Sequence, residues 1–156
     1  MKQYDATDAA SLSEDAEIAA IVDEAAAKAE VLGAEVVGTM PDALFRGSDE
    51  GKEPGSNRGV ESTLNNFIAQ AQRDSVAKAV GKDIDLGVMN AGGVRADLPA
   101  GEVTYKDVFT VQPFGNSVAY GKVSGADLIK ALENQWQDGA SRPRLAMGLS
   151  DNVQVV

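Results

Sequence analysis

The apolar run from Ile84 to Met89 constrains the fold more than any other stretch of the sequence. It is short and rich in β-forming side chains, and this pattern predicts a strand that is buried on both faces. A strand of that kind needs packed helices or further strands on each side. Because the polar, glycine-bearing stretch Asn90–Arg95 follows at once, the strand is expected to open directly onto a loop.

Two amphipathic helices are expected. The first is predicted over about 13–32, after the capping-box pattern Ser11–Glu14, and combines dense alanine with apolar side chains at helical spacing. Gly33 provides its stop. The second helix is predicted over about 62–80 and stops at Gly81.

The remaining elements are shorter and alternate between strand and helix patterns. We expect, in order, a strand over Ala34–Thr39, a long loop over Pro41–Gly59, a short strand at Val103, a helix over Tyr105–Thr110 capped by Thr104, a strand over Ser117–Val123, a helix from Ser124 to about Gln135, and a β-like end over Leu145–Val156. This mixture predicts an α+β fold, a mixed sheet with packed helices.

The length suits one domain. Residues 1–10 are polar and are expected to be loosely ordered, and 11–156 are expected to form a single domain. The apolar stretch Val153–Val156 ends the chain abruptly, so we expect the domain to be incomplete at its C-terminus. An open strand edge there would offer a route to a homodimer.

Charge and composition exclude several classes of function. The net charge of −10 disfavours a nucleic acid polymer or an anionic membrane as partner, because both require a basic surface. The chain has no cysteine and no histidine. It therefore has no disulfide, no Ser-His-Asp triad and none of the commonest ligands of transition metals. No segment is apolar enough to cross a bilayer, and any export signal is expected to lie outside this chain.

The loop that follows the predicted strand carries the first candidate binding residues. Gly92 and Gly93 would allow a close backbone approach to a ligand. Arg95 offers a planar set of donors for phosphate or carboxylate, and Asn90 can both donate to and accept from the edge of a base or sugar. The alternative is a tight turn with a surface arginine.

A second loop, Gln112–Asn116, carries the next candidates. Phe114 lies between a stiff proline and a flexible glycine, and is either a stacking platform for a base or sugar or a core aromatic. Asn116 would bind a base edge or its own backbone in a turn. Arg58 precedes a predicted helix start, where anions are favoured, and is either half of a phosphate clamp with Arg95 or a surface arginine.

Five segments combine these residues into an ordered series: Arg58–Ile68, Asn90–Arg95, Gly101–Val108, Val111–Asn116 and Ser124–Leu128. Together they closely resemble the C-terminal domain of the 5′-nucleotidase family. That family includes bacterial UDP-sugar hydrolases, 2′,3′-cyclic nucleotide phosphodiesterases and animal ecto-5′-nucleotidase. The resemblance covers about Arg58 to Gly148.

The resemblance implies a substrate-binding domain with a fold like that of the family's C-terminal domain. By the family's motifs, Arg58 and Arg95 would contact the phosphate and ribose side of the substrate, and Asn90 and Asn116 the base edge. Phe114 would stack on the base. Gly92, Gly93 and Gly148 would admit a close approach of the substrate.

The resemblance also implies that the chemistry belongs to a partner domain. In this family an N-terminal metallophosphoesterase domain holds two divalent metal ions, which activate a water against the phosphate. We therefore expect this chain to bind a nucleotide or nucleoside, to hold no cofactor and to hydrolyse nothing alone. The parent protein is expected to be extracellular, periplasmic or associated with the cell wall.

Two departures from the family pattern weaken the expected binding. Some members have a second arginine four positions before Arg58, where this chain has Pro54. The family's later segment, an aromatic residue followed by Gly-Gly-Asp-Gly, supplies the second face of the base sandwich and does not occur here. Two alternatives stay open: a stand-alone module for nucleosides or nucleotide sugars, and a structural or interaction domain that has lost the pocket.

Overall fold

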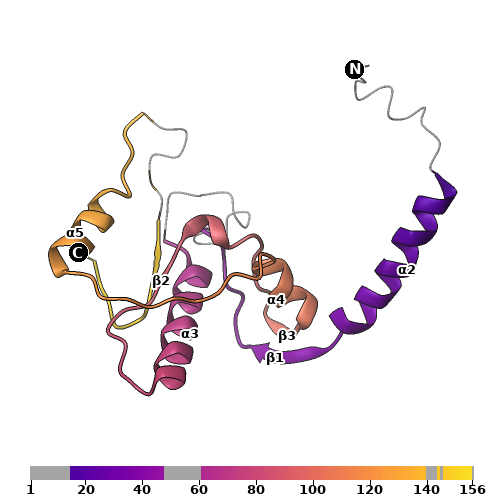
Figure 1. The fold of residues 1–156 in the computed structure, drawn as a ribbon, viewed down its shortest axis with the longest axis horizontal. Helices are drawn as coiled ribbons and strands as arrows, with labels where there is room; N and C mark the ends of the chain where they lie inside the picture. The colour runs from indigo at the N-terminus through magenta and orange to yellow at the C-terminus, as the bar shows by residue number, and fades with distance from the viewer. Residues whose placement is uncertain (1–14, 48–60, 140–143, 145, 156) are drawn as a thin grey trace.

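The computed structural model describes residues 15–47, 61–139, 144 and 146–155. Along the chain the elements are α2 (Ala16–Gly33), β1 (Val36–Met40), α3 (Thr63–Val80), β2 (Val88–Met89), the 3-10 helix η1 (Ala91–Gly93), β3 (Gly101–Thr104), α4 (Tyr105–Val111), α5 (Gly125–Glu133) and β4 (Gly148–Leu149). In Figure 1, α2 extends away from the other elements. Helices combined with small antiparallel strand pairs confirm the α+β class.

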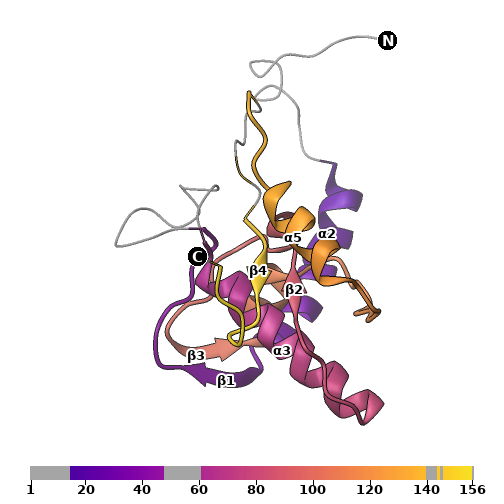
Figure 2. The same ribbon diagram turned by 90° about the vertical axis from the view of Figure 1, so that its left-hand side faces the viewer.

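The strands of the described residues form two antiparallel pairs, each of which joins distant segments of the chain. β1 pairs with β3, with Thr39 opposite Glu102. β2 pairs with β4, with Met89 opposite Gly148. Figure 2 shows β2 and β4 side by side next to α3, with β1 and β3 as a separate pair. The short strands predicted near 34–39 and 103 are thus confirmed, as β1 and β3.

The core lies between α3 and β2 and extends to β3 and α4. Ala69 of α3 is 0% exposed and packs in one cluster with Met89 of β2. The other buried members of the cluster are Leu64, Val94, Leu98, Val103 and Val111. Two glycines bring the backbone of the strand pair onto the helix, since a Cβ at Gly87 would collide with the Ala69 carbonyl and one at Gly148 with the Asn65 carbonyl. Glycine is required at both positions.

Local capping residues end the helices where the sequence predicted. Ser62 caps α3 through its hydroxyl, and Gly81 ends that helix in the left-handed region at φ 65°. Thr104 and Asp107 form a capping box at α4, and Ser124 caps α5. The three predicted helices are therefore confirmed.

The first helix begins later than the predicted start near 13. Asp15 has an extended backbone, with φ −75° and ψ 117°, and its carboxylate accepts from two backbone N–H groups of the first turn. The helix consequently starts at Ala16. The pattern Ser11–Glu14, like residues 1–10, lies outside the described residues.

The apolar face of α2 is exposed in the described part of the chain. Gly33 is the buried residue of this helix, and a Cβ added there would lie 3.1 Å from Cβ of Lys106 on α4. The exposed apolar side chains of α2 are Ile18, Ile21, Val22, Val31 and Leu32. Helical spacing therefore predicts the helix correctly without showing what its apolar face packs against. None of the described helices has the length and apolar character needed to cross a membrane.

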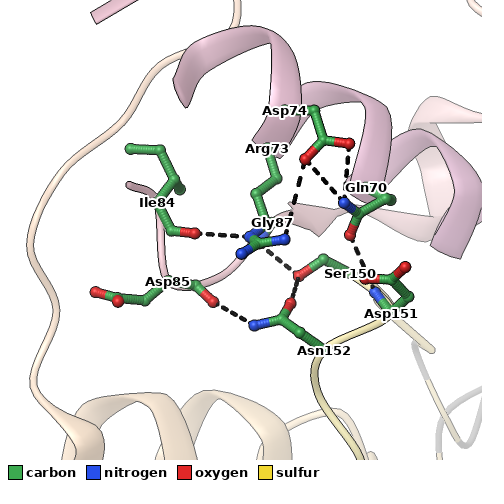
Figure 3. A network of polar contacts seen from close by, with 9 residues as sticks. All are labelled: Gln70, Arg73, Asp74, Ile84, Asp85, Gly87, Ser150, Asp151 and Asn152. Carbon is green, nitrogen blue, oxygen red and sulfur yellow. Dashed lines mark hydrogen bonds and ion pairs between the residues drawn. The ribbon is translucent and has the colours of Figure 1, made fainter. Parts of the chain in front are cut away.

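The strand predicted over 84–89 is wrong for most of its length. β2 keeps the last two residues, and the first of these is 42% exposed, so the run is not buried on both faces. Ahead of β2, side chains bond to backbone groups that a partner strand would otherwise use (Figure 3). The Gly87 carbonyl alone accepts from a backbone group of the neighbouring segment, the Ser150 N–H at 3.0 Å, among the described residues. Arg73 Nε donates to the Ile84 carbonyl at 2.6 Å, and Gly87 N–H donates to Ser150 Oγ at 2.9 Å. Backbone groups bonded in this way are not available to a ladder.

One further predicted strand is wrong, and another is confirmed only over β4. Residues 117–123 have no strand partner within the described residues, and Val118, Tyr120 and Val123 are 51%, 62% and 62% exposed. Of the β-like end predicted over 145–156, β4 alone is a strand in the described part, and a turn follows at 151–152. Alternating apolar residues fold as a strand when a neighbour offers backbone partners.

The close approach at Gly148 gives a test of the packing of α3. We expect Gly148→Ala to lower the free energy of unfolding by about 1–3 kcal/mol, because the added methyl forces β4 away from the helix backbone. Gly121→Ala is the matched control, since a Cβ there meets nothing within 4 Å. Urea unfolding of both variants measures the difference. Equal stabilities would contradict the close packing.

The capping box of α4 gives a pH-dependent test. The Thr104 hydroxyl, and then its backbone N–H, donate to Asp107 and lower the pKa of that carboxyl. A carboxyl whose pKa is lowered by folding stabilises the folded state at pH values above its usual pKa. This stabilisation is lost as the pH falls through the lowered pKa. We expect Asp107→Asn to cost under about 1 kcal/mol at pH 7 and nothing in strong acid, as measured by unfolding at each pH. A cost that is independent of pH would contradict this.

Candidate functional site

A cavity of about 480 Å³ lies where α3, β2 and the two predicted loops meet. Gln72 of α3 and both residues of β2 line it, together with Asn90, Gln112 and residues 114–119. The two loops picked out in the sequence thus face one cavity. Asn90, Phe114 and Asn116, three of the predicted binding residues, are brought together here.

Asn90 lies at the cavity because a glycine in η1 leaves space for its side chain. Its backbone is extended, and its side chain makes no cap hydrogen bond. A Cβ at Gly93 would lie 2.9 Å from Asn90 Oδ1 and would collide with the Met89 methyl group, whereas a Cβ at Gly92 would make an ordinary contact of 3.7 Å. Gly93 therefore makes room for the side chains of Asn90 and Met89.

Arg95 and Phe114 form the rim of the site. The guanidinium carbon of Arg95 lies 5.9 Å from the centre of the Phe114 ring, within the range of a cation–π contact. Arg95 Nη1 donates to the Gly92 carbonyl at 3.3 Å, and its backbone N–H donates to the Val111 carbonyl at 2.9 Å. Phe114 is 54% exposed, which excludes the alternative of a core aromatic.

The other predicted residues are placed differently. Asn116 lines the cavity and is exposed. Gly148 lies in β4, where it packs on the backbone of Asn65, and it is not among the residues that line the cavity. Arg58 lies outside the described residues.

Two glutamines of the cavity were not predicted from the sequence. Gln112 Nε2 lies 3.5 Å from Met89 Sδ, and Gln72 Nε2 lies 3.7 Å from the same sulfur. A signal for Gln72 was present, because it continues the four-residue spacing of Leu64 and Ile68 along α3. A polar side chain in an apolar helix stripe indicates either a buried hydrogen bond or a site.

The cavity is polar but uncharged. Its polar groups are the amides of Gln72, Asn90, Gln112 and Asn116 and the hydroxyl of Ser117, and no Asp, Glu, Lys or Arg of the described residues lines it. Across the described residues, no group of three or more acidic residues converges as a metal site would require. Neutral amides beside an aromatic ring suit a flat, neutral ligand with hydrogen-bond donors and acceptors on its edge.

Comparison with known families decides what kind of domain this is. The family model described as "5'-nucleotidase, C-terminal domain" matches residues 36–155. The chain belongs to this family. The family resemblance seen in the sequence is therefore confirmed, and the match includes both loops of the cavity.

Individual relatives agree with this assignment. The chain is 30% identical over 124 residues to a probable 5′-nucleotidase of Treponema pallidum, a match that covers 80% of this chain and 21% of that protein. It is 32% identical over 133 residues to a cell wall protein of Listeria monocytogenes, covering 81% of this chain and 17% of that protein. The chain thus spans about a fifth of the length of these relatives.

A solved structure confirms the fold. The crystal structure of a 5′-nucleotidase precursor from Thermus thermophilus superposes with a TM-score of 0.61 at 28% identity, over 80% of this chain and 23% of that one. The α+β arrangement around α3 is therefore a fold found within a 5′-nucleotidase.

Proposed function

We propose that this chain is the nucleotide-binding domain of a metal-dependent 5′-nucleotidase-like phosphoesterase, which acts in nucleotide catabolism by hydrolysing nucleotides to nucleosides and phosphate. The observation that carries the proposal is the cavity itself. Two loops of a 5′-nucleotidase C-terminal domain bring an exposed aromatic ring and three amides to one neutral cavity, and α3 adds the amide of Gln72.

The base is proposed to occupy the cavity. Half of the Phe114 side chain is exposed, so a ring face is available for stacking. Asn90 and Asn116 line the same space and carry both donors and acceptors, which suits the mixed edge of a nucleobase. The absence of charge among the described lining residues supports a base rather than a phosphate at this place.

The phosphate and ribose side is proposed to lie at the rim. Arg95 is exposed, contacts the Phe114 ring and does not line the cavity. A ligand whose base stacks on Phe114 would therefore place its charged end near this guanidinium, which binds phosphate well. Arg58 is proposed to join Arg95 there, and Gly92 and Gly93 to allow the close approach of the ligand.

Catalysis is assigned to another part of the parent protein. Two divalent metal ions are proposed to bind an N-terminal metallophosphoesterase domain, which the greater length of the relatives supports. An extracellular, periplasmic or cell-wall location is supported by the name of the Listeria relative. One edge of β4 has no partner strand within the described residues, which supports a homodimer through this edge.

Removal of the stacking ring tests the proposed site. A base stack contributes about 1–3 kcal/mol, so we expect Phe114→Ala to weaken adenosine binding roughly fivefold or more. Saturation-transfer NMR suits the weak binding expected from a single stack, with a dissociation constant on the order of millimolar. Phe109→Ala is the matched control, since Phe109 is also 54% exposed and lies on α4 outside the cavity. Equal losses in both variants would contradict the site.

An activity assay tests the assignment of chemistry to another domain. We expect the 156-residue chain to release no phosphate from AMP with Mn²⁺ or Zn²⁺ present. Phosphate release that Arg95→Ala abolishes would show that this chain is itself the enzyme. Tight adenosine binding without hydrolysis, lost in Phe114→Ala, would favour a stand-alone nucleoside-binding module instead.

A further inference from the structure

We infer that Gln72 and Gln112 make the cavity selective for a base with an exocyclic amino group, adenine or cytosine, over a base with an oxo group at the same place. The inference rests on the proposed function, since it assumes that a base occupies the cavity. It adds two specificity-determining residues, and it narrows the substrate to amino-bearing nucleotides.

The sulfur of Met89 fixes how both amides are oriented. Met89 is 6% exposed and belongs to the core cluster, so its side chain is held in place. Gln72 and Gln112 approach its Sδ from different elements, at 3.7 Å and 3.5 Å. A thioether sulfur accepts hydrogen bonds and has none to donate. The amide group that faces the sulfur must therefore be the NH₂, in both glutamines.

Each glutamine consequently keeps its carbonyl oxygen for another partner. Within the described residues, neither Gln72 Oε1 nor Gln112 Oε1 takes part in a hydrogen bond, and both side chains are part-buried at the cavity wall. A donor on a bound ligand would satisfy such an acceptor. Both glutamines line the cavity, one from α3 and one from the loop after α4, and each keeps an acceptor oxygen that no described residue uses.

The chemistry of the bases turns this arrangement into a preference. An exocyclic amino group carries two N–H donors, and a glutamine oxygen is a suitable acceptor for one of them. An oxo group at the same position is itself an acceptor and would face the glutamine oxygens without a shared proton. One neutral hydrogen bond of this kind changes affinity by about three- to tenfold.

Adenosine and inosine form the diagnostic pair, because they differ in an amino and an oxo group at one ring position. Gln72→Met removes the amide, keeps the side-chain length and retains contact with Met89. We expect the 156-residue chain to prefer adenosine, and Gln72→Met to weaken adenosine roughly three- to tenfold while changing inosine less than about twofold. Gln154→Met is the matched control, since Gln154 is exposed and outside the cavity, and should change neither.

A second variant separates recognition from packing. Gln72→Glu keeps acceptor oxygens at the same length, so it should keep the preference for adenosine even if overall binding falls. Equal binding of the two nucleosides by the unaltered chain, or an equal loss of both in Gln72→Met, would overturn the inference. The proposed function would survive that outcome as long as both nucleosides bind and Phe114→Ala weakens both. If neither nucleoside binds, the proposed function and the inference both fail.

Discussion

The close packing of α3 against β2 and β4 is the interaction on which the rest of the structure depends. Gly87 and Gly148 let the strand pair lie against the helix backbone, where any larger side chain would collide. The buried hydroxyl of Ser150 links the two segments, because it accepts a hydrogen bond from Gly87 N–H (Figure 3). Residues from both sides of this contact line the cavity, with Gln72 on the helix and Met89 on the strand. The cavity therefore depends on the contact between α3 and the strand pair.

The site separates a neutral hollow from a charged rim, and this separation gives the domain its proposed role. Amides face the cavity, and the exposed Arg95 stays outside it beside the ring of Phe114. A nucleotide whose base is buried in the cavity would leave its phosphate in water near the guanidinium. A separate catalytic domain could reach the phosphate there. Binding and chemistry are then contributed by different surfaces. Under the proposed function, the domain would need no acid, base or metal ligand of its own.

Local signals made much of this architecture predictable. Ser62, Gly81, Thr104 and Ser124 each end or begin a helix through bonds within a few residues, so the sequence shows them directly. Residues 84–87 have a distant hydrogen-bond partner instead. The Ser150 hydroxyl, which accepts from Gly87 N–H, lies 63 positions further along the chain. Residues 84–87 therefore had the pattern of a strand. Residues 117–123 had it as well, because a local pattern does not show whether a partner strand is present.

The same distinction applies to the site. Asn90, Phe114 and Asn116 lie in loops that the sequence shows directly. The helical spacing of Gln72 shows only that it lies on the apolar side of α3, and its contact with Met89 appears only in the fold. Amide chemical-shift mapping of the 156-residue chain with AMP reports on every residue of the cavity at once. We expect the side-chain NH₂ signals of the four cavity amides to shift together, along with the ring signals of Phe114. Shifts confined to other surfaces, or none at millimolar AMP, would contradict the proposed site.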